Sequence, residues 1–194
     1  MTVDLILASA SPRRRELLSL TGLSFQVDAP NVDEHTALGA RDAVQEIARR
    51  KALAAAALHP GQIVLAADTL VALEDAPLGK PQDAEDAFRM LKMLSGRWHQ
   101  VYTGVCVVSG SGEVFAGLDA SHVRFVEMRD EDIRRYIATG ECMDKAGAYA
   151  LQGAAGMFIE EVQGTPSGII GLPLPLTRRL LRQCGLLLPR ASAC

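Results

Sequence analysis

An aspartate interrupts an almost wholly apolar stretch in the middle of the chain. Residues 63–73 read IVLAADTLVAL, which predicts a strand buried on both faces with Asp68 inside it. Burying a carboxylate costs on the order of several kcal/mol unless it is paired or binds a metal. Asp68 therefore either caps a turn or pairs with a structural arginine, or it is a functional group near the carboxyl end of a strand, where open α/β sheets bind ligands. We favour the functional interpretation because perturbed carboxylates concentrate at active sites.

A cluster of arginines lies at the start of a predicted helix. The segment 9–15 reads SASPRRR, and Ser11 followed by Pro12 is typical of an N-cap and first helical position, so a helix is expected over 12–20. The three arginines lie in its first turn, where the helix dipole favours anions. They form either a solvated basic patch or a phosphate site, in which the hydroxyl of Ser9 or Ser11 assists the guanidinium groups. Both interpretations remain open at this point.

Two lysines and an acidic pair also have alternative roles. Lys51 falls on the apolar face of a helix expected over 40–58, so it either reaches past that face to water or points into a cleft. Lys80 lies on a rigid turn between glycine and proline and, taken alone, is an exposed loop lysine. Asp33 and Glu34 form either a solvated loop pair or a source of carboxylate oxygen for a divalent cation.

Several function classes lack their signatures in this chain. No H-E-x-x-H, G-x-x-x-x-G-K-[ST] or G-x-S-x-G motif occurs, which argues against zinc hydrolases, P-loop NTPases and α/β-hydrolases. The four cysteines form no C-x-x-C pair, so Cys106 and Cys142 are interpreted as core thiols in a reducing compartment. The formal net charge of −3 disfavours a nucleic-acid surface. Without a signal peptide or a membrane-length apolar stretch, we expect a cytoplasmic protein with neither nucleic-acid nor membrane partners.

The elements expected to position these residues alternate between helices and strands, which predicts a mixed α/β fold. Residues 98–108 and 114–126 form a hairpin around SGSG, and the Gly- and Ala-rich stretch 140–156 is an irregular functional loop. We expect a single domain over 1–188 and a frayed tail over 189–194. The other expected strands are 3–8, 63–73 and 157–162, and the other expected helices are 83–94, 130–138 and 175–184.

Short motifs spread along the chain resemble the Maf family when they are taken together. They occur in family order over residues 5–174, and the ordered set is far more specific than any single motif. The motifs are LASASPRR at 7–14, ADT at 67–69, GKP at 79–81, LSG at 94–96, HQVYT at 99–103, DKAGAY at 144–149, LQG at 151–153 and GLPL at 171–174.

The resemblance implies a fold, an activity and a set of site residues. The fold is a mixed, twisted sheet with flanking helices and two lobes around a cleft, related to inosine triphosphate pyrophosphatases. The activity is hydrolysis of a nucleoside triphosphate to its monophosphate and pyrophosphate, with Mg²⁺ or Mn²⁺ as cofactor. The implied roles are proton acceptor for Asp68; base selection for Arg13, Thr69 and Gln152; phosphate binding for Ser9, Arg14, Lys51, Lys80 and Lys145; metal binding for Glu34 with Asp68; and a further place in the cleft for Asp144.

The substrate branch is suggested by two of these motifs. The DKAG and LQG pieces resemble the branch that acts on dTTP and UTP, whereas a sister branch acts on 7-methyl-GTP and has a different sequence there. The same chemistry on a modified purine triphosphate is one alternative, and a non-enzymatic, nucleotide-binding regulator of cell division is another. A homodimer is also compatible with the resemblance. The segment 164–167, GTPS, stands where the family often has an aromatic residue.

Overall fold

The computed structural model describes residues 3–187, which form a seven-stranded mixed sheet with helices on both faces. The strand order is β2-β1-β3-β5-β6-β7, and β4 pairs with β3 off this path. β1 runs parallel to β2 and β3, and the remaining pairs are antiparallel. The strands are β1 (Leu5–Leu7), β2 (Phe25–Val27), β3 (Val64–Leu73), β4 (Ala76–Leu78), β5 (Trp98–Val108), β6 (Val114–Phe125) and β7 (Ile159–Gln163).

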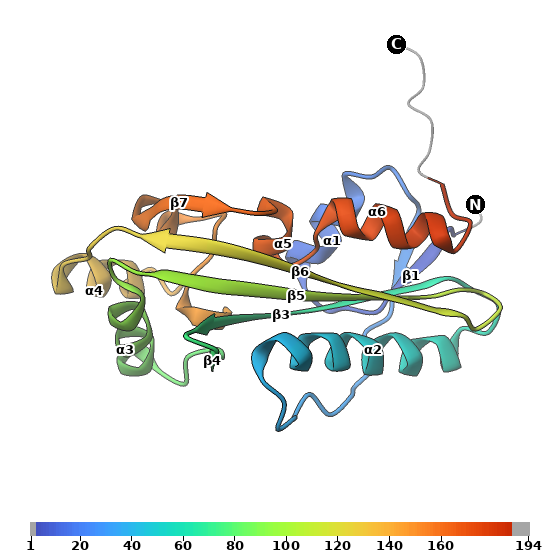
Figure 1. The fold of residues 1–194 in the computed structure, drawn as a ribbon, viewed down its shortest axis with the longest axis horizontal. Coiled ribbons are helices and arrows are strands. Elements are labelled where there is room, and N and C mark those ends of the chain that lie inside the picture. The colour runs from blue at the N-terminus through green and yellow to red at the C-terminus, as the bar shows by residue number, and fades with distance from the viewer. Residues whose placement is uncertain (1–2, 188–194) are drawn as a thin grey trace, which may run out of the picture.

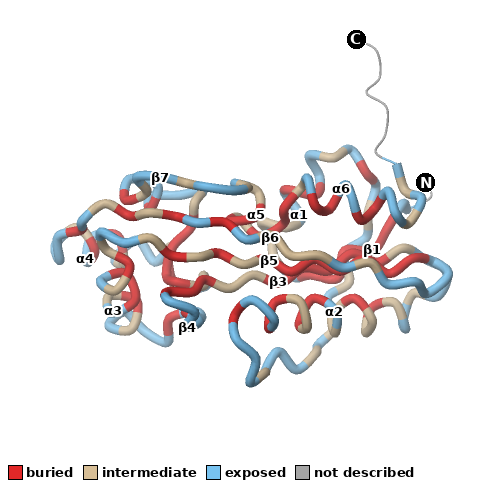
Figure 2. The backbone as a smooth tube through the Cα atoms, in the orientation of Figure 1, coloured by how far each residue is buried: buried red, intermediate tan, exposed pale blue. Residues whose placement is uncertain are grey.

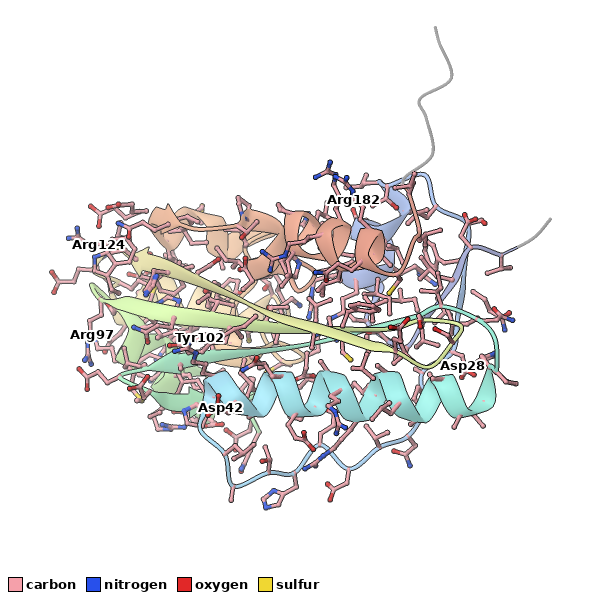
Figure 3. The ribbon with its side chains drawn as sticks, turned by 45° about the vertical axis from the view of Figure 1, so that its right-hand side comes forward. Asp28, Asp42, Arg97, Tyr102, Arg124 and Arg182 are labelled. Atoms are coloured by element: carbon pink, nitrogen blue, oxygen red, sulfur yellow. The ribbon has the colours of Figure 1, made fainter. Side chains whose placement is uncertain are left out.

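Helices cover both faces and one end of this sheet. Figure 1 shows α2 along one side of the long strands, α1 and α6 on the other side, and α3 and α4 together at one end. Figure 3 shows Asp28 and Arg97 at opposite ends of the elongated molecule. The helices are α1 (Pro12–Ser19), α2 (Ala40–Leu58), α3 (Ala84–Leu94), α4 (Asp130–Ala138), α5 (Pro166–Ile170) and α6 (Leu174–Gln183), with 3₁₀ helices η1 (Ala146–Ala148) and η2 (Ala154–Phe158).

Strand alternation distributes the core over the two faces of the sheet. In β1, Leu5 and Leu7 pack in an apolar cluster with residues of α1 and α6, whereas Ile6 packs with alanines of α2. Successive side chains of a strand point to opposite faces, so one short strand contributes to both layers. A third cluster lies at the end formed by α3, α4 and β7. In Figure 2 the buried residues accordingly follow the strands and the inner sides of the helices.

The sheet has a gap along one edge of β3. On that edge β1 pairs only with Val64 and Leu65, and β4 pairs only from Val71 onward. The opposite edge is paired continuously with β5. Residues 66–70 of β3 therefore have no neighbouring strand on the gap side among the described residues. Because both faces of the sheet are accessible at such a gap, side chains of either face can reach it.

The backbone of α2 lies unusually close to the sheet opposite this gap. Gly104 in β5 pairs directly with Asp68 in β3. A Cβ atom on Gly104 would lie 2.3 Å from the carbonyl oxygen of Val44 in α2, well inside contact distance. Glycine at this position therefore allows the helix to lie directly over the strand pair.

The expected elements are present, with several differences. α2 and β5 have the expected bounds, and Ser11 caps α1 by accepting a hydrogen bond from the backbone of Arg14. The short elements β2, β4 and α5 have no counterpart among the expected ranges, and the loop 140–156 contains two short 3₁₀ helices. The expected tail over 189–194 lies outside the described residues. Among the described residues, no helix has the length and apolar character required to cross a bilayer.

Candidate active site

A cleft of about 850 Å³ opens at the gap in the sheet. Its walls come from the segment after β1, the loop before α2, α2 itself, the middle of β3, the turn after β4 and the loop 144–152. The structure thus brings together segments that lie far apart in the sequence. Every one of the eleven site residues expected from the sequence lines this cleft: Ser9, Arg13, Arg14, Glu34, Lys51, Asp68, Thr69, Lys80, Asp144, Lys145 and Gln152.

Asp68 differs from its expected place in one respect. It is the fifth residue of a ten-residue strand and not a residue that emerges at a strand end. It reaches the cleft because β1 ends at Leu7, before its neighbour β3 does. Asp68 and Thr69 point to opposite faces of the sheet, as successive strand residues must. Both nevertheless line the same cleft, since the gap exposes both faces.

The carboxylate of Asp68 forms a buried ion pair. The ammonium group of Lys51 lies 2.8 Å from Oδ1 of Asp68 and 2.9 Å from a carboxylate oxygen of Glu34. Lys51 and Asp68 are largely buried, whereas Glu34 is exposed at the mouth of the cleft. Oδ2 of Asp68 has no hydrogen-bond partner among the described residues. Lys51 therefore points into the cleft, which answers the question that its place on an apolar helix face left open.

Arg14 is fixed by three contacts on the other face of the sheet. Its Nε donates to the carbonyl oxygen of Gly171 at 2.9 Å, and its terminal nitrogens donate to the hydroxyls of Ser9 and Thr69, both at 3.2 Å. Burial lowers the pKa of the guanidinium, and the negative charge of Asp68 opposes that shift. Arginine nevertheless stays protonated in proteins, so Arg14 is a fixed cation at the cleft wall.

An ion-pair chain joins the start of α1 to the loop 144–152. Arg13 lies 3.4 Å from Asp144, and the ammonium of Lys145 lies 2.5 Å from the other oxygen of the same carboxylate. The hydrogen bond from Lys145 is the main reason that the pKa of Asp144 is lowered. Asp144 is two-thirds exposed, so these contacts contribute little stability and are easily exchanged for a ligand.

Two predicted site residues have side chains without hydrogen-bond partners. Lys80 and Gln152 are exposed at the cleft, and no side-chain contact of either is found among the described residues. The backbone next to Lys80 is nevertheless held, because the N–H of Gly147 donates to the carbonyl oxygen of Gly79 at 3.0 Å. A Cβ on Gly147 would lie 2.9 Å from Val71, so this close approach requires glycine. The side chains of Lys80 and Gln152 are therefore available to a ligand.

The loop that carries Gln152 is organised by a residue that the sequence did not indicate. Glu141 accepts hydrogen bonds from the hydroxyl of Tyr136 and from the backbone N–H of Ala154, both at 3.0 Å. A Cβ on Gly153 would lie 2.4 Å from the same carboxylate. A glutamate in a glycine-rich loop is common, so nothing in the sequence distinguished Glu141 from acidic residues that are merely exposed to solvent.

A buried aromatic group supports the floor of the cleft. Tyr149 lines the cleft, and its hydroxyl lies 2.8 Å from Nε2 of His99, which is fully buried. Phe125 packs edge-on against both rings. Burial lowers the pKa of His99 to about 4, so this histidine is neutral near pH 7. His99 is therefore a supporting group behind the cleft.

The segment 164–167 does not belong to the cleft wall among the residues that the structure describes. Instead it is anchored to β6, because the hydroxyl of Thr165 donates to Asp119 and its backbone N–H donates to Ser121. The side chains of this segment therefore contribute nothing to the cleft lining.

A divalent metal was expected between Glu34 and Asp68, and the donor set fits one. Both carboxylates converge on the same ammonium group of Lys51, so a cation at this point has two oxygen donors within reach. No group of three or more acidic, histidine or cysteine side chains suited to a metal occurs among residues 3–187. Mg²⁺ is usually held by one or two carboxylates, with water and substrate phosphates completing its shell. Two carboxylates in an open cleft match that pattern.

Curated proteins of similar length match nearly the whole chain. A dTTP/UTP pyrophosphatase of Anaeromyxobacter dehalogenans (strain 2CP-C) is 50% identical over 194 residues, covering 97% of this chain and 98% of that protein. Proteins of the same name are 47% identical in Bdellovibrio bacteriovorus, covering 93% and 98%, and 45% identical in Geobacillus sp. (strain WCH70), covering 94% and 98%.

Similarity to solved structures is partial. The Ham1 protein of Staphylococcus aureus has a TM-score of 0.48 at 15% identity, covering 62% of this chain and 71% of that one. A dITP/XTP pyrophosphatase of Mycobacterium abscessus has a TM-score of 0.40 at 16% identity, covering 64% and 74%. The mixed α/β class is confirmed by the sheet and helices of this chain.

The sequence profile of one family spans almost all of the described fold. The profile described as Maf-like protein matches residues 4–184, which include every residue expected at the cleft. Together with relatives at 45–50% identity over nearly their full length, this match establishes that the chain belongs to the Maf family.

Proposed function

We propose that this protein hydrolyses dTTP and UTP, each to its nucleoside monophosphate and pyrophosphate. The observation that carries the proposal is the cleft, in which a buried aspartate with one unoccupied carboxylate oxygen lies among cationic side chains. The choice of substrate is supported by the three relatives named above, each of which is called a dTTP/UTP pyrophosphatase.

The charge of the cleft suits a triphosphate. Five of its residues are cationic, and three are acidic, so the lining favours a polyanion. Preorganised cations aimed at developing negative charge supply much of the catalysis in phosphate chemistry. In the proposed complex the phosphates contact Ser9, Arg14, Lys51, Lys80 and Lys145. The exposed contact of Arg13 with Asp144 is weak enough for Arg13 to turn toward the nucleotide.

Asp68 is the proposed proton acceptor. Its Oδ1 is held by Lys51, which fixes the carboxylate and leaves Oδ2 to orient a water molecule. The water oxygen forms a bond to the α-phosphorus while the bond from that phosphorus to the bridging oxygen breaks. Pyrophosphate leaves with the bonding electron pair, and the proton of the water passes to Asp68. The reaction requires no covalent enzyme intermediate.

Glu34 and Asp68 are the proposed holders of Mg²⁺ or Mn²⁺. When bound, such an ion supplies positive charge to the phosphate oxygens and helps to orient the substrate. Lys51 contacts both carboxylates and keeps them together before the ion binds. Its ammonium stays on Oδ1 of Asp68 and exchanges only its contact with the exposed Glu34 for a phosphate oxygen.

Base selection is proposed for Gln152, Thr69 and Arg13. An amide such as that of Gln152 can donate to a base carbonyl and accept from a ring N–H, which fits thymine and uracil. The side chain of Gln152 has no partner among the described residues, so it can make both bonds without breaking another. We place the enzyme in the cytoplasm, in agreement with buried, unpaired thiols at Cys106 and Cys142.

A panel of nucleoside triphosphates tests this function. The purified protein is incubated with dTTP, UTP, ATP, GTP and 7-methyl-GTP in the presence of Mg²⁺ or Mn²⁺, and monophosphate and pyrophosphate are both quantified. The expected result is equal amounts of the two products, with dTTP and UTP hydrolysed fastest. Orthophosphate with a diphosphate product would refute the reaction type, and a preference for 7-methyl-GTP would refute the substrate. Nucleotide binding without turnover on any substrate would support a regulator instead.

A further inference from the structure

Two threonines form a hydrogen-bonded pair beneath the cleft. Thr69 of β3 and Thr103 of β5 are direct partners in the sheet register, and their hydroxyl oxygens lie 2.9 Å apart. Thr103 is fully buried and does not line the cleft, whereas Thr69 does. Thr103 also lies 2.9 Å from the carbonyl oxygen of Gly168 in α5.

The positions of the hydroxyl hydrogens follow from these contacts. A carbonyl oxygen can only accept, so the single hydroxyl hydrogen of Thr103 points to Gly168. Thr103 then has only lone pairs to offer to Thr69, and Thr69 must donate its own hydrogen to Thr103. The hydroxyl of Thr69 is thereby left as an acceptor toward every other neighbour. The guanidinium of Arg14, which donates to Thr69 at 3.2 Å, is such a neighbour.

We infer that Thr103 is a positioning residue, which fixes Thr69 as a hydrogen-bond acceptor toward the cleft and through it orients Arg14. If Thr69 turned its hydrogen outward, that hydrogen would face the N–H groups of Arg14. Three of the five N–H groups of the Arg14 guanidinium donate hydrogen bonds within the protein, one of them to Thr69. Loss of the Thr69 contact would leave one terminal nitrogen of Arg14 without its acceptor.

The fixed polarity also limits what Thr69 can recognise, an inference that rests on the proposed function. A phosphate oxygen has no hydrogen to donate at neutral pH, so Thr69 cannot hydrogen-bond to it in this arrangement. A substrate group that contacts Thr69 must be a donor, such as the ring N3–H of thymine or uracil. Thr103, Thr69 and Arg14 thus form a chain of hydrogen bonds, called the relay below. In the relay, Thr69 can contact the base or Arg14 but not the phosphates.

The test is a double-mutant cycle on kcat/KM for dTTP. Thr103→Val removes the hydroxyl at nearly constant volume and is expected to lower kcat/KM by about tenfold, the effect of one neutral hydrogen bond. In a Thr69→Val background the same change is expected to alter kcat/KM by less than about twofold, because the group through which it acts is gone. Thr103→Ser, which keeps the hydroxyl, is expected to restore most of the lost kcat/KM.

A matched control comes from a second buried threonine. The hydroxyl of Thr177 in α6 is buried and has no hydrogen-bond partner among the described residues. Thr177→Val makes the same chemical change away from the cleft and is expected to leave kcat/KM unchanged. An equal, about tenfold loss from Thr103→Val in both backgrounds, or no loss in either, would overturn the relay.

A measurement without substrate separates this inference from the proposed function. The Nε–H signal of Arg14 in ¹⁵N-edited NMR, assigned by its disappearance in Arg14→Lys, reports the arrangement of the guanidinium. Thr103→Val and Thr69→Val are both expected to shift that signal, and Thr177→Val is not. If the wild-type protein is inactive on every triphosphate but the two variants show these shifts, the proposed function is refuted and the relay is not. An unshifted signal in Thr103→Val would refute the relay alone.

Discussion

Lys51 and Asp68 form an ion pair in which both side chains are about nine-tenths buried, with 2.8 Å between Nζ and Oδ1. The pair lies on the α2 face of the sheet, at the gap where β3 lacks a neighbour. Removing one partner of a buried pair leaves the other charge uncompensated, which is strongly destabilising when no other partner exists. Here Glu34 also contacts Lys51, so the ammonium keeps one carboxylate if Asp68 loses its charge.

Asp68→Asn is therefore expected to fold and to lose turnover. The amide keeps the shape of the side chain but cannot accept a proton, and a loss of at least about a hundredfold in kcat is expected for removal of a general base. Steady-state release of pyrophosphate and urea unfolding measure the two effects separately. Asp28→Asn is the matched control, because the carboxylate of Asp28 also has a side-chain partner, Nε2 of His59 at 2.6 Å, but does not line the cleft. Wild-type turnover in folded Asp68→Asn would place the base elsewhere.

Lys80→Ala is expected to impair activity without affecting stability. The ammonium of Lys80 has no partner among the described residues, so its removal breaks no contact within the protein. Turnover is expected to fall by about tenfold or more, since one charge-assisted bond to phosphate is lost. Lys92→Ala, which removes an exposed lysine paired with Asp130, is the control for loss of a surface charge. If thermal unfolding showed that Lys80→Ala mainly lowers Tm, Lys80 would be a structural residue.

Gln152→Leu is expected to change the order of substrates more than the chemistry. The leucine fills similar space but leaves the base edge without its hydrogen bonds, which is a large source of discrimination in a binding pocket. The ratio of kcat/KM for dTTP to that for ATP is expected to fall by about tenfold, while pyrophosphate remains the product. The measurement is kcat/KM for dTTP, UTP, ATP and GTP with both proteins. An unchanged ranking would remove Gln152 from base selection.

Removal of divalent metal is expected to abolish turnover. Without the ion, the carboxylates of Asp68 and Glu34 add negative charge beside the phosphates, and the cationic side chains of the cleft leave that charge only partly neutralised. EDTA treatment followed by desalting should give an inactive protein, and Mg²⁺ or Mn²⁺ should restore activity. The Glu34→Gln variant is expected to need a higher metal concentration for half-maximal activity. Full turnover by the metal-free protein would contradict both assignments.

Stability is expected to fall with acid through His99. Burial lowers the pKa of His99 from 6.5 to about 4, so between these values the unfolded chain binds a proton that the folded protein does not. The free energy of unfolding therefore decreases as pH falls from 6.5 to 4, by about 3 kcal/mol from this residue. Urea unfolding from pH 4 to 7 measures the decrease. His99→Gln, which keeps a polar group facing Tyr149, should show a smaller decrease, and equal decreases would exclude His99 as the cause.

The long elements could be predicted from the sequence because their signals are local. In the helix 40–58 and the strand 98–108, the periodic recurrence of apolar residues is visible within a few residues, and the structure confirms both elements. β4 and α5 were missed because each is short and contains a residue that disfavours its class. Pro77 lies within β4, and Gly168 lies within α5.

The composition of the cleft could also be predicted, but its geometry could not. The motifs indicated which side chains gather, and all eleven line one cleft. That Asp68 and Thr69 reach it from opposite faces depends on where β1 and β4 stop pairing with β3, a relation between distant segments. The pairing of Thr69 with Thr103 likewise depends on sheet register, which no local pattern reports.

The close contact between Gly104 and α2 has a consequence for sequence variation. An alanine there would put its Cβ 2.3 Å from the Val44 carbonyl oxygen, so the helix would have to retreat by about 1 Å. Lys51, about two turns further along that helix, would move away from Asp68 with it. Substitutions of Gly104 are therefore expected to be selected against, although this residue contacts no ligand. In a mutant library that randomises the β5 residues outside the cleft, few active members are expected to carry a substitution at this glycine.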